Sequence, residues 1–266
     1  MRQEIHIACG QFAAQPGDAA TNVARMIEYA GQAQAEGCAL ILFPELIVTG
    51  YLPPGQVRPL AEPLTGPSVR ALAQAAQQIG IAIAFGMAEL DEALGVRYNS
   101  LVIVDRQARL AGLYHKMHLW DTEREWAEPG REVLSVEMEN VRYGGWICYD
   151  TRFPELARLG ALAGAEVALV PTAWLGPGDE WELALRARAL DNGIFIAGAD
   201  IVGPDPALRC RGLSLIVDPR GKVLARAEPD SEGIICATLR QADMDAQRGR
   251  VPLLRHRRPS LYRGLV

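Results

Sequence analysis

Short apolar runs alternate with amphipathic stretches along the whole chain, and this alternation limits the folds that the sequence can adopt. Apolar runs at 5–11 and 39–43 flank a helical stretch at 21–36, and the second half repeats this order from residue 141. Alternation of this kind predicts an α/β protein whose helices cover the faces of a sheet. Because the order occurs twice, we expect two related halves within one α/β domain.

Two further segments have the pattern of antiparallel hairpins. Their turns lie at 105–108 and at 218–222, and the second turn, Asp-Pro-Arg-Gly-Lys, has residues that favour a tight reversal. Residues 203–206 are rich in proline and are expected to form a surface loop. The predicted hairpins are 99–104 with 109–114 and 212–217 with 223–227. Helices are also predicted at 68–79, 154–163 and 180–192, and strands at 81–86, 141–148, 167–170, 194–199 and 234–238.

The composition is that of an ordinary globular protein. The chain has 266 residues, of which 49% are hydrophobic and 22% charged, so a single domain spanning 1–266 can bury a sizeable core. The net charge of −5 gives no support for nucleic-acid binding, and the basic cluster at 248–263 is expected to be a solvated or interface-lining tail. No apolar run approaches the ~20 residues of a membrane span, and the N-terminus is not typical of a signal peptide. We therefore expect a cytoplasmic protein that binds neither membrane nor nucleic acid.

Five cysteines are scattered along the chain, at positions 9, 38, 148, 210 and 236. Their spacing does not predict a metal site, and a reduced environment is expected. Cys148 is distinguished by its setting, because an apolar run ends at it and Pro154 then opens a predicted helix. A thiol that faces a helix N-terminus gains from the positive end of the helix dipole, which favours the thiolate. Gly144 and Gly145 would let other backbone approach closely. The alternative is that Cys148 is a small buried hydrophobe, as many free cysteines are.

A nucleophilic thiol needs a base, because its ordinary pKa of about 8.5 leaves it mostly protonated at neutral pH. His115 and His118 follow the first hairpin and could pair with the thiol or hold a metal. Glu45 directly follows an apolar strand, where burial would raise its pKa and suit it to general-base catalysis. Lys116 also ends a strand, where it could stabilise an oxyanion or lie on the surface. An acid, a cation and a thiol at strand ends together favour nucleophilic catalysis.

Three ordered motifs make the chain resemble the nitrilase superfamily, the carbon–nitrogen hydrolases with a Glu–Lys–Cys triad. Residues 43–51 resemble the family's glutamate segment, residues 114–119 its lysine segment, with His115 where Arg is usual, and residues 145–155 its cysteine segment. The resemblance implies that Glu45, Lys116 and Cys148 are catalytic. It also implies a second glutamate soon after the lysine, for which Glu123 has the expected spacing, whereas Glu125 is expected to be a surface charge.

The resemblance further implies a four-layer α-β-β-α sandwich that pairs across a dimer interface, as a homodimer or a larger homo-oligomer. It implies no metal and no organic cofactor. Tyr149 follows the cysteine, where true nitrilases tend to have Trp, and this favours hydrolysis of a small primary amide, with ω-amino amides as one candidate class. The Tyr149 backbone N–H is expected to help hold the oxyanion. Tyr51 and Trp174 are candidate substrate-binding residues, although the tryptophans at 120, 146, 174 and 181 could equally be core residues.

The sequence also allows three other functions. A hydrolase of N-carbamoyl amino acids, similar to ureidopropionase, would use the same triad on a ureido substrate. A non-catalytic family member would serve as a regulatory or interaction subunit, although it would have no need of all three triad residues. A Cys–His hydrolase would use His115 or His118 as the base.

Overall fold

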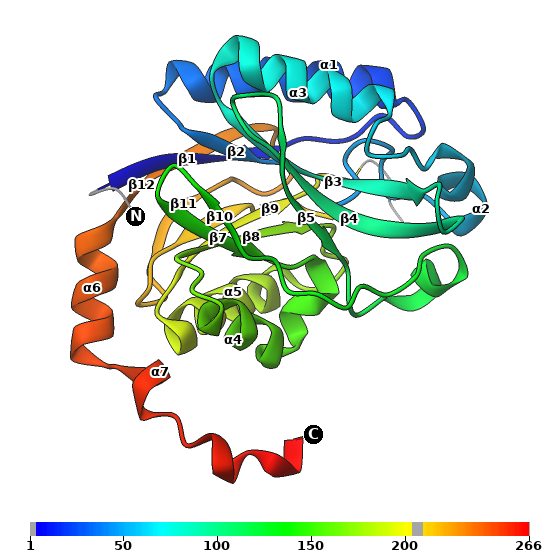
Figure 1. The fold of residues 1–266 in the computed structure, drawn as a ribbon. Helices are drawn as coiled ribbons and strands as arrows, with labels where there is room; N and C mark the ends of the chain where they lie inside the picture. Colours follow the sequence, from blue (N-terminus) through cyan, green and yellow to red (C-terminus); the bar gives the residue numbers. More distant parts are fainter. Residues whose placement is uncertain (1–3, 204–209, 266) are drawn as a thin grey trace.

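The computed structural model describes residues 4–203 and 210–265 and arranges them in two mixed β-sheets of six strands each (Figure 1). The first sheet consists, in spatial order, of β12 (Gly233–Arg240), β1 (Glu4–Gln11), β2 (Leu40–Leu42), β3 (Ala82–Asp91), β4 (Val96–Val104) and β5 (Leu110–His115). The second consists of β11 (Val223–Arg226), β10 (Leu215–Val217), β9 (Phe195–Asp200), β8 (Val167–Thr172), β7 (Val141–Gly145) and β6 (Val136–Met138). The predicted loop at 203–206 lies, apart from Gly203, outside the described residues.

The two sheets have the same pattern of strand directions. In the first, β1, β2 and β3 are parallel, β12 is antiparallel at one edge, and the β4–β5 hairpin is antiparallel at the other. In the second, β7, β8 and β9 are parallel, with β6 at one edge and the β10–β11 hairpin at the other. The chain is therefore built of two related halves, as the alternation predicted, and both predicted hairpins are confirmed. The first half takes its edge strand, β12, from the C-terminal part of the chain.

Helices cover the outer face of each sheet and complete the four-layer sandwich (Figure 1). The helices α1 (Ala19–Ala35) and α3 (Pro67–Ile79) lie on the first sheet, and α4 (Pro154–Leu162) and α5 (Gly178–Asn192) lie on the second. The Asp18 carboxylate caps α1 by accepting the Thr21 N–H at 3.0 Å. Gly80 ends α3 in the left-handed region, at φ 81°, where glycine is favoured.

The remaining elements are short or lie in the C-terminal segment. The chain from α6 onwards runs along and then beyond the sandwich (Figure 1). Among the described residues, no helix is both long and apolar enough to cross a bilayer. These elements are α2 (Pro54–Val57), α6 (Gln241–Arg250) and α7 (Leu253–His256), with 3₁₀ turns at η1 (Arg58–Leu60), η2 (Asp121–Glu125), η3 (Cys148–Arg152), η4 (Pro259–Leu261) and η5 (Arg263–Leu265).

Apolar side chains fill both the space between the sheets and the space under the helices. One cluster joins the two sheets through residues such as Ile7, Leu101 and Leu169, and a second packs α1 and α3 on the first sheet through Met26 and Leu72. At roughly 1.5–3 kcal/mol for each large aliphatic side chain buried, this packing is the main source of stability. It also fixes the strand ends near Glu45, Lys116 and Cys148.

One strand ends earlier than the sequence predicted. The run at 141–148 was expected to be extended up to the cysteine, but β7 ends at Gly145. The chain turns because the Ile147 N–H donates to the Asp150 carboxylate at 3.1 Å and Cys148 adopts a φ of 47°. The polar side chain of Asp150 thus competes with the sheet for the backbone. The strand β6 was not predicted because it has only three residues, and the helix α6 was not predicted because its residues are mostly polar and lack apolar periodicity.

Candidate active site

Glu45 leaves the end of β2 and is completely buried. Its Oε2 accepts the Ala173 N–H at 2.9 Å, and its own N–H donates to the Thr172 carbonyl at 3.4 Å, so the turn after β2 is tied to the end of β8. The adjacent strand β3 approaches very closely at Gly86, where a Cβ would lie 2.5 Å from Glu45 Cα. Only glycine fits at this position without displacing the Glu45 turn.

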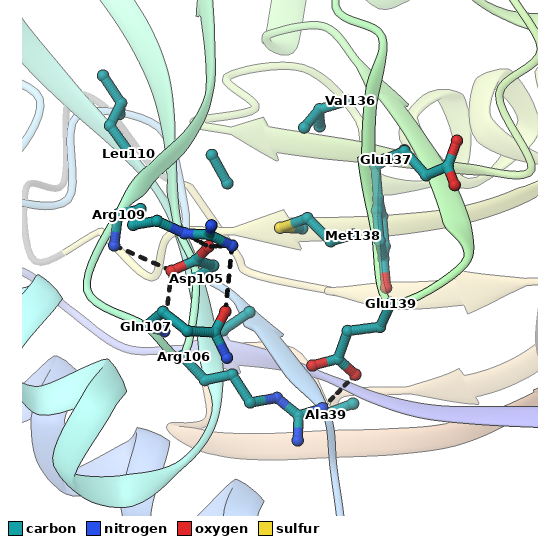
Figure 2. Close-up of a pocket in the computed structure, with 13 residues that line it drawn as sticks. Ala39, Asp105, Arg106, Gln107, Arg109, Leu110, Val136, Glu137, Met138 and Glu139 are labelled. Atoms are coloured by element: carbon teal, nitrogen blue, oxygen red, sulfur yellow. Dashed lines mark hydrogen bonds and ion pairs between the residues drawn. The ribbon is translucent and has the colours of Figure 1, made fainter.

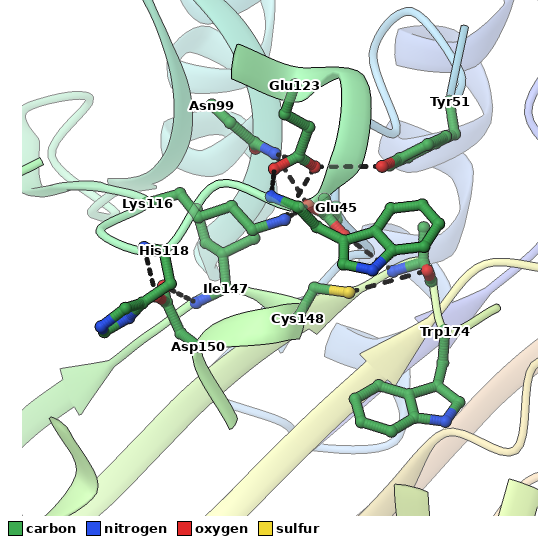
Figure 3. Close-up of polar contacts among 12 residues, drawn as sticks. Glu45, Tyr51, Asn99, Lys116, His118, Glu123, Ile147, Cys148, Asp150 and Trp174 are labelled. Atoms are coloured by element: carbon green, nitrogen blue, oxygen red, sulfur yellow. Dashed lines mark hydrogen bonds and ion pairs between the residues drawn. The ribbon is translucent and has the colours of Figure 1, made fainter. Parts of the chain in front are cut away.

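Lys116 lies at the centre of a buried polar cluster (Figure 3). Its Nζ lies 2.7 Å from Glu45 Oε1 and 2.7 Å from Glu123 Oε1, and all three side chains are shielded from solvent. Asn99 of β4 donates from Nδ2 to Glu45 Oε1 at 2.7 Å and to Glu123 Oε1 at 3.3 Å. Glu123 also accepts the Tyr51 hydroxyl at 3.1 Å. The cluster thus holds two carboxylates on one ammonium group, with amide and hydroxyl donors around them.

Cys148 opens the η3 turn beside this cluster. Its φ of 47° lies in the left-handed region, which non-glycine residues adopt rarely and at a cost of about 1–3 kcal/mol. Its Sγ lies 3.6 Å from the Ala173 carbonyl, and Ala173 also donates its N–H to Glu45. Gly145 allows the chain to reach this turn, because a Cβ there would lie 2.5 Å from the Leu169 carbonyl. The close approach predicted for the glycines before Cys148 is therefore present.

Burial governs the protonation of the three groups. Burial raises the pKa of Glu45; Lys116 opposes this shift, and the charge of Glu123 adds to it. Burial also raises the pKa of the Cys148 thiol well above its ordinary value, with Glu45 adding to the shift and Lys116 opposing it. For Lys116 burial acts to lower the pKa, but Glu45 and Glu123 outweigh it and raise the pKa. A thiol whose pKa is raised in this way is protonated at neutral pH and needs a base.

Both candidate histidines are engaged by other carboxylates. His115 Nε2 lies 2.8 Å from Glu89 Oε2, and its ring stacks on Tyr98 at 3.8 Å. His118 Nδ1 lies 2.8 Å from Asp150 Oδ1, and its ring stacks on Phe153. The His118 contact supports the turn at Cys148, because Asp150 belongs to that turn. These contacts do not favour the Cys–His interpretation.

A cavity of about 160 Å³ opens at Cys148. Trp120, Tyr149, Arg152 and Trp174 line it, with residues 173–176 forming one wall. Such a volume accommodates a small ligand.

Two predicted pocket residues differ in where they lie. Trp174 is on the wall of the cavity, and Asp200 holds its backbone by accepting the Trp174 N–H at 2.9 Å. The Tyr51 hydroxyl is directed at Glu123 instead, so Tyr51 contacts the polar cluster and not the wall of this cavity (Figure 3). Trp146 and Trp181 are core residues: their indole N–H groups donate to Thr151 Oγ1 and to the Leu213 carbonyl.

A larger cavity, of about 380 Å³, lies between the β4–β5 and β6–β7 hairpins (Figure 2). Its charged groups are paired: Arg109 with Asp105 at 2.8 Å, Arg106 with Glu139, and Glu137 with Arg142, which lies outside the lining. Its lining residues include no cysteine, serine or histidine. The cavity at Cys148 is therefore the better candidate for catalysis.

Three residues of the site were not found from the sequence. Asn99 bridges the carboxylates, Asp150 shapes the Cys148 turn, and Asp200 is a buried carboxylate with a pKa raised well above its ordinary value by burial. Asn99 and Asp200 are polar residues within apolar strands, and Asp150 follows an apolar run after two residues, Cys148 and Tyr149; this was the available signal. It is a weak signal, because such residues also occur at exposed strand ends.

A four-layer sandwich with glutamate, lysine and cysteine at its strand ends is the arrangement that the motifs predicted. The family model described as carbon-nitrogen hydrolase matches residues 6–248. The chain is 35% identical over 269 residues to the probable nitrilase C965.09 of Schizosaccharomyces pombe, covering 99% of each chain. It is 30% identical to the 2-oxoglutaramate amidase of Bacillus subtilis, covering 96% of this chain and 98% of that one.

The crystal structure of Saccharomyces cerevisiae Nit3, a member of branch 10 of the nitrilase superfamily, superposes with a TM-score of 0.89. It is 30% identical to this chain, and the match covers 96% of this chain and 97% of that one. The chain therefore belongs to the carbon–nitrogen hydrolase family, within the nitrilase superfamily.

Proposed function

We propose that the protein hydrolyses the C–N bond of a small primary amide, giving a carboxylate and ammonia through a cysteine thioester. The observation that carries the proposal is the buried convergence of Glu45, Lys116 and Cys148 at the edge of a small cavity. ω-Amino amides are one candidate class of substrate. The amidase name of the Bacillus subtilis relative supports the reaction class.

In the first step, Glu45 accepts the Cys148 proton as the sulfur attacks the amide carbonyl. Burial raises the pKa of Glu45 and so makes its carboxylate a stronger base than an exposed glutamate. Glu45 then returns the proton to the leaving nitrogen, and ammonia departs as the thioester forms. A water molecule, deprotonated by the same carboxylate, cleaves the thioester and regenerates the thiol.

Lys116 is suited to hold the developing oxyanion. A lysine ammonium has three N–H donors, and Glu45 and Glu123 accept two of them at 2.7 Å each. The third is available for the substrate oxygen, together with the Tyr149 backbone N–H. Loss of one oxyanion donor commonly lowers the rate about 10²–10³-fold. Glu123, tied to Tyr51 and Asn99, would fix the position of Lys116.

The test is to assay purified Cys148→Ala and Glu45→Gln on a panel of amides, nitriles and carbamoyl compounds by ammonia release. Wild-type protein should release ammonia from a small amide and show an acyl-enzyme mass on rapid acid quench. Both variants should lose the acyl-enzyme, and Cys148→Ala should lose turnover. Retention of wild-type turnover by Cys148→Ala would reject the proposal. Preference for nitriles would instead favour the activity named for the Schizosaccharomyces pombe relative.

A second candidate is hydrolysis of an N-carbamoyl amino acid by the same three residues. Arg152 favours it, because this residue lines the cavity, its guanidinium lies 4.8 Å from the Trp174 ring centroid, and it could meet a substrate carboxylate. Arg152 also pairs with Glu180 at 2.5 Å, so a substrate carboxylate would have to compete for it. Carbon dioxide released together with ammonia would identify this reaction.

We further propose that the protein forms a homo-oligomer through the face formed by α4 and α5. Leu159, Leu162 and Leu190 lie on these helices with 45–49% of their surface exposed, and the C-terminal segment adds Leu261 at 63%. The helices α4 and α5 contact each other, so the exposed leucines that they carry suit an interface between copies of the chain. Light scattering should give the mass of a dimer or larger assembly for the wild type, and a smaller mass for Leu159→Glu.

A further inference from the structure

Three side chains of metal-binding type lie together on the helix-covered face of the first sheet, although they are far apart in the sequence. His6 is in β1, Cys236 is in β12, and Cys38 lies in the turn between α1 and β2. A ring nitrogen of His6 and the two sulfur atoms all lie within 4.8 Å of one another. Nothing in the carbon–nitrogen hydrolase chemistry uses these residues.

The register of the sheet creates this cluster. His6 pairs with Thr238 across the antiparallel β1–β12 ladder, and Cys236 is two residues from Thr238. Because side chains alternate along a strand, His6 and Cys236 project from the same face. Cys38 reaches that face from the α1–β2 turn, where the Ala39 N–H donates to the His6 carbonyl at 2.8 Å. Cys9 is also in β1 but three residues from His6, so it belongs to the apolar cluster between the sheets.

The spacing is close to that of a tetrahedral zinc site. With Zn–S of about 2.3 Å and Zn–N of about 2.0 Å, tetrahedral ligand atoms lie about 3.4–3.8 Å apart. Movements of about 1 Å would therefore bring all three atoms into coordination. Thr238 Oγ1 lies 2.9 Å from His6 Nδ1 and fixes the orientation of the ring, which is the usual role of a residue behind a metal ligand.

We propose that His6, Cys38 and Cys236 bind a zinc ion through one nitrogen and two sulfur atoms, with solvent completing the tetrahedron. The ion joins β12, β1 and the turn that leads into β2. It thereby ties the C-terminal edge strand to the half of the sandwich from which Glu45 projects. Binding displaces the thiol protons into solvent, so affinity increases with pH. The proposal does not rest on the proposed amidase function.

The test uses the full chain carrying Cys148→Ala, which removes the thiol that opens into the cavity and could react with added metal. Zn²⁺ is titrated against a chromophoric chelator, and Co²⁺ is used as a spectroscopic probe. The expected result is a single equivalent of Zn²⁺, a thiolate–cobalt charge-transfer band and a rise in Tm with zinc. Cys38→Ser and Cys236→Ser should lose all three signals. The control is Cys9→Ala. Cys9 lies in β1 with His6 but projects from the opposite face, so this variant should keep all three signals.

Thr238→Val retains every ligand and provides a second variant if a cysteine substitution prevents folding. It should weaken zinc binding about 10–100-fold, the usual effect of losing a residue that orients a ligand. The proposal is overturned if zinc binds no more tightly to the Cys148→Ala protein than to its Cys38→Ser derivative. It is equally overturned if peptide mapping of the zinc-treated protein finds Cys38 and Cys236 joined as a disulfide.

Discussion

Asn99 donates its side-chain amide to Glu45 at 2.7 Å, and the same nitrogen lies 3.3 Å from Glu123. The two carboxylates are buried and carry like charges, so they repel each other. Hydrogen-bond donors between them are needed to offset this repulsion. Lys116 provides the charge that they need, and the Asn99 amide, fixed on β4, restricts where each oxygen can lie. The position of the proposed base therefore depends on a residue outside the three motifs.

Replacement of Asn99 by Ala should lower kcat while leaving the protein folded. Glu45 and Glu123 would lose a shared donor, and loss of a buried hydrogen bond to charged groups costs about 1–3 kcal/mol. Urea unfolding should show that the free energy of unfolding decreases by this amount. Steady-state kinetics should show a larger effect on kcat than on KM. Gln107→Ala, at an exposed turn, is the control. An unchanged kcat in Asn99→Ala would contradict the role given to this residue.

Gly86→Ala should reduce activity through Glu45. The added Cβ would lie 2.5 Å from Glu45 Cα and 2.6 Å from Leu46 N, so the turn would have to move. Gly31→Ala is the matched control: it lies in α1, has no atom within 4 Å of the added Cβ, and should stabilise the protein by about 0.5–1 kcal/mol. The two variants are compared by Tm and by kcat/KM. Equal activities would show that the close approach at Gly86 is not needed.

The pH dependence of kcat/KM should report Glu45. The base must be ionised, and burial raises its pKa, with Lys116 opposing this shift and Glu123 adding to it. Activity should therefore fall as the pH decreases through this raised pKa, above the ordinary glutamate value of about 4.3. Glu45→Gln should lose about 10²–10⁴-fold in rate, together with this acid limb. An acid limb that persists in Glu45→Gln would assign the base to another group.

Lys116→Met should destabilise the protein most at high pH. Removal of the cation leaves two buried carboxylates unpaired, which costs about 3–5 kcal/mol. Burial raises the pKa of Glu45 and Lys116 opposes this shift, so without the lysine the folded-state pKa of Glu45 would lie above the unfolded value. The folded state then binds more protons, and stability decreases as the pH rises. Urea unfolding should give a lower free energy of unfolding for the variant than for the wild type. This difference should be smaller at mildly acidic pH than at mildly alkaline pH. A deficit independent of pH would contradict this account.

Substitution of the two histidines should separate the remaining alternatives. His115→Gln should leave kcat/KM close to the wild-type value, because His115 pairs with Glu89 on β3. His118→Gln should lower it moderately, since His118 supports Asp150 and the Cys148 turn. Loss of all activity in either variant, with activity retained in Glu45→Gln, would restore the Cys–His mechanism.

The sequence by itself determined the α/β class, both hairpins and the segments that carry Glu45, Lys116 and Cys148. It could do so because period-two and helical patterns, turn residues and short motifs are local in the chain. The strand boundaries were less well determined: β7 ended early because Asp150 competes for the backbone at Ile147. The roles of Glu45, Lys116, Cys148 and Glu123 stay predictions that the proposed assays test.

Only the tertiary structure decided which side chains meet. The hydrogen bond from Asn99 in β4 to Glu45 after β2 spans 54 positions, and the contact of His6 with Thr238 spans 232. No local pattern encodes such distances, because they depend on which strands pair and in what register. For the same reason, cysteines that appeared scattered at positions 38 and 236 became neighbours once β12 paired with β1.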